Sequence, residues 1–167
     1  MERTIIVDVE TSGLSASRGG RVIEIGAVVV EGGHIIDEYA ALIDTGVSIS
    51  YGAFQVHGIS EQMLCGQPSP QDIWPNFAEF VGNMPLVAHN ASFDCSFVRN
   101  ELALVGLLHL NLWHCTLRLA RKKLPKLPNH RLDTVYCHLF GGLPAGVQRH
   151  RALDDARMAA RIWVGLS

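Results

Sequence analysis

The sequence predicts an α/β fold in which helices flank a mixed β-sheet. Three β-branched runs with short connections come first, and from about residue 60 helical periodicity alternates with short apolar runs. Strands joined by short turns pair antiparallel, whereas strands separated by helices can pair parallel. The 167 residues can bury a substantial core, and they contain no repeat, low-complexity tract or linker. We therefore expect a single domain over residues 1–167, with three antiparallel strands followed by parallel ones.

The expected strands are apolar, β-branched runs that end at turn residues. The first, T-I-I-V-D-V-E, leads into a loop rich in Gly and Ser, and E-G-G-H forms a hairpin turn between the second and third strands. The strands are expected at residues 4–10, 21–30, 35–43, 85–89 and around 110–113.

The expected helices have recognisable start and stop residues. Ser60 precedes Glu61 as an N-cap, Pro70 and Gly82 lie near the two ends of the next helix, and Gly106 closes the one after it. The helices are expected from residue 61, at 69–82, 93–105, 116–124 and 131–140, and from just after His150 to the end.

Composition excludes several classes of protein. Hydrophobic residues make up 48% and charged residues 18%, which argues against disorder. No apolar run approaches the roughly 20 residues of a membrane span, and the N-terminus lacks a signal-peptide layout. We expect a cytoplasmic protein with no membrane partner. The four cysteines and eight histidines match no zinc-finger or ribbon spacing, so we expect reduced, mostly buried thiols.

Charge is unevenly distributed along the chain. The net charge is −2, yet residues 118–167 hold ten of the 14 Lys and Arg residues against three acids. Residues 1–117 hold four basic residues against thirteen acids. The basic C-terminal third is consistent with phosphate contact, and equally with a solvated charged surface.

Three acids in two segments are candidates for metal ligands. Asp8 and Glu10 are two residues apart on the first predicted strand, so their side chains share a face. Two such carboxylates repel and lose hydration, and a divalent cation is the usual compensation; the alternative is a strand that ends in solvent. Asp94 is either an acid near a helix N-terminus or a third ligand. It shares a stripe with Val98 and Leu102, which favours the ligand.

Helical phase separates the neighbouring aspartates of H-R-A-L-D-D-A. Asp155 shares a stripe with apolar residues of the last helix and is predicted to face inward. Asp154 shares a solvated, salt-bridged face with Arg157 and Arg161. His150 would lie about 140° from Asp155 on a continuous helix, so it is expected in the preceding loop. There it is either simply exposed or, near metals, a general base with a pKa near neutrality.

Carboxylates from separate segments suit the hydrolysis of a phosphodiester. Two hard cations roughly 3.5–4 Å apart can lower the pKa of a bound water and clamp the phosphate. Mg²⁺ and Mn²⁺ take oxygen ligands, and two such ions are the expected cofactors. A glycosidase needs only two acids and would leave Asp94, Asp155 and the basic third unexplained. We interpret Glu24, a further carboxylate, as structural.

Three segments in this order, D-V-E-T-S-G (8–13), H-N-A-S-F-D (89–94) and H-R-A-L-D-D-A (150–156), resemble the exonuclease motifs of the DEDD superfamily. The subtype resembles DEDDh (DnaQ-like) exonucleases, such as the proofreading subunit of DNA polymerase III, ribonuclease T and oligoribonuclease. V-H-G-I-S (56–60) resembles a further signature, and Arg151 stands where the sister subtype has Tyr. The first motif has T-S-G for the commoner T-T-G, with a hydroxyl retained. The resemblance covers essentially the whole chain and implies a ribonuclease H-like fold, two Mg²⁺ or Mn²⁺ ions and release of 5′-mononucleotides from a 3′ end.

The resemblance also implies roles for individual residues. The catalytic set is the metal ligands Asp8, Glu10, Asp94 and Asp155 with the base His150. Thr11 to Leu14 resemble the segment that holds the terminal nucleotide, with Leu14 against its base. His57, Asn90 and Phe93 resemble neighbours of the 3′ end, although Phe93 could equally be core and His57 a loop cap.

Three hypotheses of function are open at this point. An active exonuclease is favoured because all five catalytic residues are present. A nucleic-acid-binding or polymerase-docking module with a silent site is the second, and another two-metal enzyme, such as an endonuclease or a nucleotide phosphohydrolase, is the third. The expected partners are single-stranded 3′ ends of DNA or RNA, with a polymerase or a second copy of the chain as further candidates. DNA is favoured by the likeness to proofreading and repair exonucleases, and the chain is either stand-alone or part of a larger protein.

Overall fold

The computed structural model describes residues 3–167 and contains a five-stranded mixed sheet in the order β3-β2-β1-β4-β5. The first three strands pair antiparallel, and β4 and β5 run parallel to β1. This confirms the predicted α/β fold with three antiparallel strands plus parallel ones. The strands are β1 Thr4–Thr11, β2 Val22–Glu31, β3 His34–Leu42, β4 Leu86–Ala88 and β5 Trp113–Cys115.

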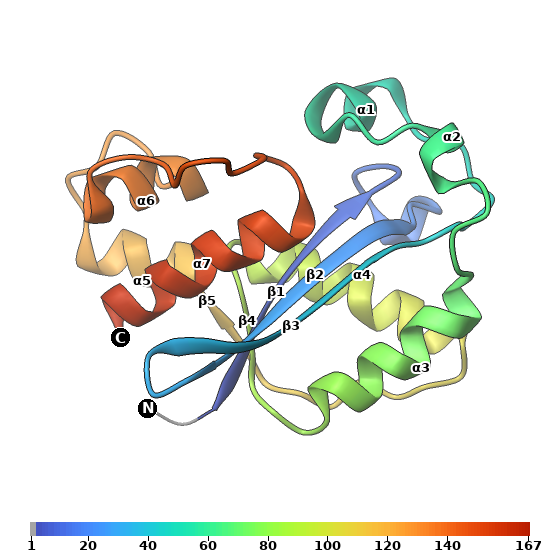
Figure 1. Cartoon of the computed structure of the whole chain (residues 1–167), viewed down its shortest axis with the longest axis horizontal. Helices are drawn as coiled ribbons and strands as arrows, with labels where there is room; N and C mark the ends of the chain where they lie inside the picture. The colour runs from blue at the N-terminus through green and yellow to red at the C-terminus, as the bar shows by residue number, and fades with distance from the viewer. Residues whose placement is uncertain (1–2) are drawn as a thin grey trace.

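Helices cover both faces of the sheet. The pair α3 and α4 packs on one face, and α5, α6 and α7 pack on the other (Figure 1). The helices are α1 Tyr51–His57, α2 Glu61–Leu64, α3 Pro70–Val81, α4 Ala91–Leu104, α5 Thr116–Lys123, α6 Leu132–Phe140 and α7 Ala152–Leu166, with a short 3-10 helix at Ala16–Arg18. Within residues 3–167, no helix combines the length and hydropathy needed to cross a membrane.

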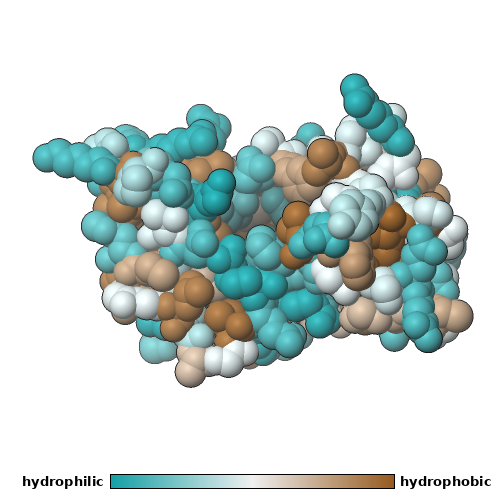
Figure 2. All heavy atoms as spheres, turned by 90° about the horizontal axis from the view of Figure 1, so that it is seen from above, coloured by the Kyte–Doolittle hydropathy of each residue, from teal (hydrophilic) through white to brown (hydrophobic). Residues whose placement is uncertain are grey.

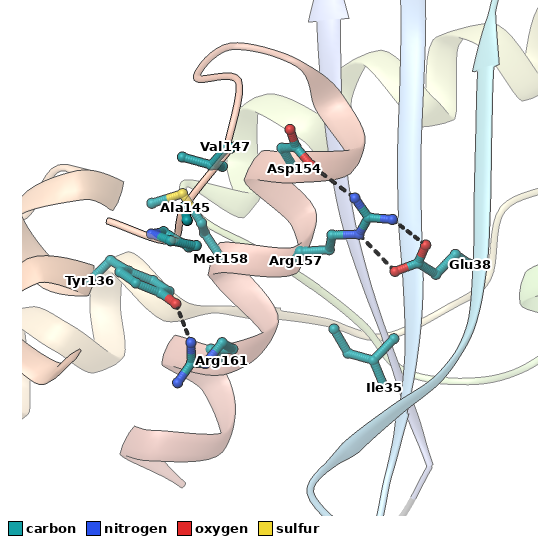
Figure 3. A pocket seen from close by; sticks show the side chains of 11 residues that line it. Ile35, Glu38, Tyr136, Ala145, Val147, Asp154, Arg157, Met158 and Arg161 are labelled. Carbon is teal, nitrogen blue, oxygen red and sulfur yellow. Dashed lines mark hydrogen bonds and ion pairs between the residues drawn. The ribbon is translucent and has the colours of Figure 1, made fainter. Parts of the chain in front are cut away.

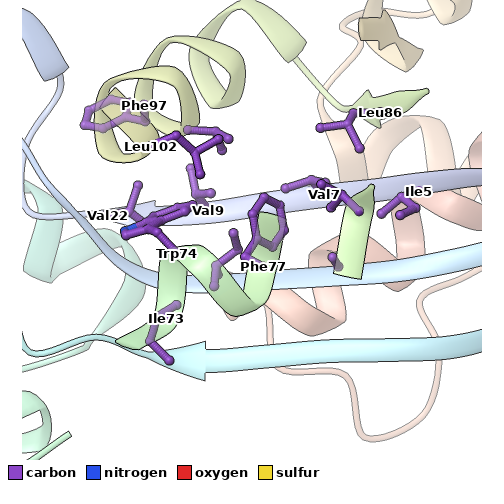
Figure 4. Close-up of a cluster of buried hydrophobic side chains, with 14 of the residues drawn as sticks. Ile5, Val7, Val9, Val22, Ile73, Trp74, Phe77, Leu86, Phe97 and Leu102 are labelled. Atoms are coloured by element: carbon purple, nitrogen blue, oxygen red, sulfur yellow. The ribbon is translucent and has the colours of Figure 1, made fainter. Parts of the chain in front are cut away.

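Large apolar side chains fill the space between the sheet and α3 and α4. Trp74 and Phe77 of α3 meet Phe97 and Leu102 of α4 over the strands (Figure 4). All four are almost completely buried. Burying side chains of this size contributes about 1.5–3 kcal/mol each, so this layer fixes the end of α4 that enters the candidate site.

The strand β1 supplies side chains to both faces in alternation. Ile5 and Val7 belong to the core under α3 and α4, and Ile6 belongs to the core under α6 and α7. Asp8 and Glu10 continue the spacing of Ile6 and therefore project toward the face that α7 covers. The prediction that the two acids share one face is confirmed by this alternation.

A glycine on β2 lets α7 approach the sheet closely. Gly26 pairs with Asp8 across the β1–β2 ladder. A Cβ atom at Gly26 would lie 2.3 Å from the carbonyl carbon of Ala152 and 2.3 Å from the nitrogen of Leu153. The first turn of α7 thus rests directly on the backbone of β2, which places Asp155 above the end of β1.

Three expectations from the sequence were wrong in detail. The last strand is Trp113–Cys115 rather than residues around 110–113. Its position is set by its pairing with Leu86–Ala88 of β4 and not by its own apolar content. Helix α1 was not predicted, although Ser50 caps its start and Gly58 its end. The thiols are not mostly buried: Cys65 is exposed and the other three cysteines are half-buried.

Candidate active site

The candidate active site lies at the end of the sheet where β1 ends and α4 and α7 begin. Figure 2 looks onto this end of the molecule and shows hydrophilic residues gathered at its centre, between two raised sides. One side carries the α6–α7 connection and the other carries α1 and α2 (Figure 1). Carboxylates from three separate segments meet in the depression.

Asp8 and Glu10 are held in surroundings that disfavour negative charge. Burial raises the pKa of Asp8 well above its ordinary value, and the charges of Asp94 and Glu10 raise it further. Burial also raises the pKa of Glu10 to about 8, with the Asp155 carboxylate the strongest of the neighbouring charges. Both acids therefore need a compensating positive charge to ionise fully near neutral pH.

Asp94 lies in the first turn of α4 and faces inward, as predicted. Only 3% of it is exposed, and Val98 and Leu102 on the same stripe are buried with it. Burial raises the pKa of Asp94 to about 7, although the backbone N–H groups of Asp94 and Val9 act to lower it. An isolated aspartate in this position would be costly, which agrees with a ligand role.

Asp155 faces inward and Asp154 does not, as helical phase predicted. Asp155 is 5% exposed. Asp154 accepts hydrogen bonds from Arg157 Nη1 at 2.9 Å and from the backbone N–H of Gln148 at 2.9 Å. Figure 3 shows Arg157 between Asp154 and Glu38 of β3. Asp154 is thus a structural residue that ties α7 to the preceding loop.

Asp154 and Arg161 were expected to share a salt-bridged face, but the structure, which describes both residues, shows no ion pair between them. Arg161 instead donates to the hydroxyl of Tyr136 (Figure 3) and lies over the ring of Phe140, with the guanidinium carbon 4.4 Å from the ring centroid. Two turns of helix separate Arg161 from Asp154, and the rings of α6 offer it a nearer partner.

His150 lies in the loop before α7, as predicted. Its backbone has a φ of 60°, a left-handed conformation that is uncommon outside glycine. The backbone N–H of His150 donates to Asp155 Oδ2 at 3.2 Å, and the ring Nδ1 lies 3.9 Å from the same oxygen. The His150 side chain is 43% exposed. The backbone of His150 is therefore held by Asp155, while its imidazole ring is partly open to solvent.

Two arginines flank His150 and fix the loop. Arg149 Nη1 lies 2.9 Å from Asp133 Oδ2, and Arg149 Nε lies 3.5 Å from Asp155 Oδ1. Arg151 donates from Nε and Nη2 to Glu24 Oε1 at 2.9 and 2.7 Å. Sequence reasoning missed both arginines as site residues, because only the folded chain brings Asp133 and Glu24 to the loop.

Glu24 accepts hydrogen bonds from the protein itself, as expected for a structural carboxylate. Besides the two bonds from Arg151, its Oε2 accepts the backbone N–H of Ala152 at 3.0 Å, at the start of α7. It also lies directly across the β1–β2 ladder from Glu10. Its charge raises the pKa of Glu10, and the charge of Arg151 lowers it.

Of the residues expected near the terminal nucleotide, Thr11 ends β1, Leu14 follows in the next loop, and His57 ends α1. Thr11 is buried and donates from Oγ1 to the carbonyl of Gly13 at 2.7 Å, whereas Leu14 is 88% exposed. His57 is buried, with Nε2 3.1 Å from the carbonyl of Thr11 and Nδ1 accepting the N–H of Ile59 at 3.0 Å. Burial lowers the pKa of His57, so its neutral ring joins the end of α1 to the segment after β1.

Asn90 and Phe93 lie at the start of α4. Asn90 is exposed, with a φ of 82°, in the N-cap position, and its side chain makes no capping bond. Phe93 is half-buried and its ring lies 4.9 Å from that of Phe97. Phe93 therefore contributes to the core and still presents part of its surface beside the site.

The donor set fits a hard divalent cation. Ligand atoms of Glu10, His150 and Asp155 all lie within 4.8 Å of one another. Asp8 and Asp94, the other two expected ligands, are not part of this cluster. Asp155 Oδ1 is buried, and its cationic neighbour Arg149 Nε, 3.5 Å away, lacks the geometry of a hydrogen bond to it. A buried carboxylate oxygen without a donor is costly, and a cation with oxygen ligands would satisfy it.

Comparison with known proteins agrees with this geometry. A sequence model of the exonuclease family (RNase T) matches residues 5–163. The chain is 39% identical over 158 residues to the PolC-type DNA polymerase III of Clostridium perfringens, covering 95% of this chain and 11% of that protein. It is 35% identical over 161 residues to the DNA polymerase III subunit epsilon of Aquifex aeolicus, covering 96% of this chain and 78% of that subunit.

Solved structures give the same result. A structure of Exonuclease X in complex with 5′ overhanging duplex DNA superposes with a TM-score of 0.79 and 30% identity, covering 98% of this chain and 90% of that one. The nuclease domain of 3′hExo, a DEDDh family member bound to rAMP, shares the fold with a TM-score of 0.79 and 16% identity, covering 97% of this chain and 90% of that one. The chain spans about a tenth of the PolC-type polymerases it matches. The chain belongs to the exonuclease family whose sequence model it matches.

Proposed function

We propose that this exonuclease works with two divalent cations, Mg²⁺ or Mn²⁺, held by Asp8, Glu10, Asp94 and Asp155. The observation that carries the proposal is the cluster of Glu10, His150 and Asp155, whose ligand atoms lie within 4.8 Å of one another. The charges of Asp8 and Asp94 act on the same group of acids, and burial raises the pKa of both. Bound cations would supply charge neutralisation at the phosphate and would acidify water. Their positive charge would also restore the ionised form of the four acids.

His150 is the proposed general base. Its ring is open to solvent, and its backbone is fixed to Asp155, so the imidazole can accept a proton from the water that attacks the terminal phosphodiester. Arg149 and Arg151 hold the loop on either side, which limits how far the ring can move. The bond between phosphorus and the 3′ oxygen of the penultimate nucleotide breaks, and a 5′-mononucleotide leaves.

The rim of the depression is the proposed binding site for the 3′-terminal nucleotide. Leu14 offers an exposed apolar surface for a base, and Thr11 shapes the turn that carries it. Asn90 and Phe93, at the start of α4, are proposed to contact the same nucleotide. His57 is proposed to hold this turn in place through its bond to the carbonyl of Thr11.

DNA is the proposed polymer, because the similar PolC-type and epsilon chains are DNA polymerase III proteins and Exonuclease X was solved with DNA. An exoribonuclease is the alternative, since the solved nuclease domain of 3′hExo holds rAMP. We propose that residues 1–167 act as one domain with a polymerase as partner. A homodimer is the second candidate assembly.

A time course on 5′-labelled single strands tests the proposal. DNA and RNA of one sequence are incubated with Mg²⁺, Mn²⁺ or EDTA, and products are resolved to single nucleotides. A ladder that shortens stepwise from the 3′ end, faster for DNA and abolished by EDTA, is expected. Internal cuts would identify an endonuclease, and activity in EDTA would contradict the metal mechanism.

A further inference from the structure

A second groove lies at the end of the sheet opposite the candidate active site. Thr4, at the start of β1, and Pro85, just before β4, line it, and its volume is about 780 Å³. Its walls come from α5, from β5 and from the last turns of α7. None of the residues described as catalytic lines this groove, so it is a separate feature of the molecule.

The groove combines positive charge with aromatic rings. Arg118, Lys122 and Lys123 of α5 line it, and among the lining residues that the structure describes none is Asp or Glu. His114 of β5 and Trp163 of α7 form a stacked pair inside it, with ring centroids 5.5 Å apart and 30° between the planes. Lys123 donates to the carbonyl of Leu166, whereas Arg118 and Lys122 are exposed.

This combination is the one that single-stranded nucleic acids require. Exposed cations along a groove contact successive phosphates, and aromatic faces stack on bases without regard to sequence. A phosphate alone would need no rings, and an apolar peptide would need no cations. An acidic protein segment would satisfy the cations but would leave the stacked pair without a matching partner.

The groove is also within reach of a strand that enters the active site. β1 joins the two, since Thr4 lines the groove and Glu10 belongs to the active site. Six residues of extended strand span about 20 Å. α5 and α7 both run from the active-site end of the sheet to the groove, because Thr116 bonds to the carbonyl of Ala88 and Lys123 to that of Leu166.

We propose that this groove binds a 5′-ward segment of the single strand whose 3′ end lies in the active site. The inference rests on the proposed function for the identity of the polymer. It predicts a length effect: oligonucleotides long enough to reach the groove bind more tightly than short ones. It also assigns Arg118 and Lys122 a role in binding the substrate and none in the chemical step.

The test uses a charge-reversal pair with a matched control. Arg118→Glu/Lys122→Glu is compared with Arg99→Glu/Lys126→Glu, which makes the same change of charge at exposed residues outside the groove. Arg118→Gln/Lys122→Gln and His114→Ala serve as milder variants. Binding of single strands of about 4 and about 16 nucleotides is measured in EDTA over a range of salt concentrations, and KM and kcat are measured with Mg²⁺.

The groove variant is expected to bind the long strand roughly tenfold more weakly and to lose about 1.4 from the slope of log K against log salt. KM for the long strand should rise by a similar factor, with kcat and all values for the short strand unchanged. Equal effects in the control pair, or none in the groove pair, would overturn the proposal. A fluorescent oligo-glutamate that binds the wild type and not the groove variant, with strand binding unchanged, would show that the groove takes an acidic protein segment. Absence of hydrolysis by the wild type would instead contradict the proposed function, because binding in EDTA is measured independently.

Discussion

At the scale of residues, the site is built from carboxylates that the fold buries away from water and places near one another. Glu10 has a pKa of about 8 and Asp94 one of about 7, against ordinary values of 4.5 and 3.8. The folded protein therefore binds protons that the unfolded chain releases. Lost hydration, together with the negative charges around Glu10, is the physical basis for strong cation binding at this position.

Stability without metal should consequently depend on pH. These raised pKa values contribute stability that is present below about pH 4 and is lost as pH rises through about 7 to 8. In EDTA, the free energy of unfolding from urea titrations should fall between pH 5.5 and pH 8.5 (about the range in which the two groups ionise). Added Mg²⁺ should restore it at the upper end.

The matched variant for that measurement is Glu10→Gln/Asp94→Asn. It removes both titrating groups while keeping their size, so its stability in EDTA should change less with pH than that of the wild type. Equal pH dependence of stability in the two proteins would show that the fold does not raise the pKa values of Glu10 and Asp94.

His150 can be tested without disturbing its unusual backbone. Asn tolerates a positive φ better than other non-glycine residues, so His150→Asn removes the imidazole and keeps the loop. Loss of a general base should lower kcat by about 10²–10⁴-fold with little change in KM. A loss of less than about tenfold would assign the proton to another acceptor.

At the scale of elements, the close approach of α7 to β2 decides where Asp155 stands. Gly26→Ala would place a methyl group 2.3 Å from the backbone of Ala152, and backbone cannot move aside as a side chain can. The substitution should lower stability by about 1–3 kcal/mol or more and reduce activity by displacing Asp155. Gly52→Ala in α1, where a methyl group meets nothing within 4 Å, is the control and should be close to neutral.

The pair of Glu24 and Arg151 joins β2 to the start of α7. Arg151→Ala would leave the buried Glu24 carboxylate without its guanidinium, beside Glu10, and should destabilise the protein by about 1–3 kcal/mol. Arg3→Ala removes an exposed pair with Glu31 and should cost less than about 1 kcal/mol. Thermal melts that show the same loss for both variants would mean that Glu24 is not held as described.

Elements also show where sequence reasoning worked and where it stopped. Periodicity predicted which face of α7 carries Asp155 because an amphipathic helix has one apolar side. It could not predict β5, since a three-residue strand is defined by its neighbour β4. Helix α1 was predictable from Ser50 and Gly58, whose capping roles were overlooked.

At the scale of the whole molecule, the active site depends on the order of strands in the sheet. Placing β1 between β2 and β4 brings the starts of α4 and α7 to the end of β1. The sequence predicted the carboxylates and the pair of Asp154 with Arg157. It could not predict that Asp133, Glu24 and Glu38, which come from distant segments, pair with Arg149, Arg151 and Arg157. These three arginines are paired with acids, so the basic third offers less free charge than its count indicated. Arg118 and Lys122 of α5, which pair with no acid that the structure describes, lie instead at the second groove.

Catalysis is proposed to depend on four inward-facing carboxylates. The most direct test measures release of the 3′-terminal nucleotide by variants at two adjacent positions, Asp154 and Asp155. Single-stranded DNA labelled on its last nucleotide is incubated with Mg²⁺ and the wild type, Asp155→Ala or Asp154→Ala. Asp155→Ala should release the labelled 5′-mononucleotide at least about 10³-fold more slowly, since a metal ligand is lost. Asp154→Ala should stay within about tenfold of the wild type, because its partners are Arg157 and the backbone of Gln148. Full activity in Asp155→Ala, or a larger loss in Asp154→Ala, would contradict the assignment of the site.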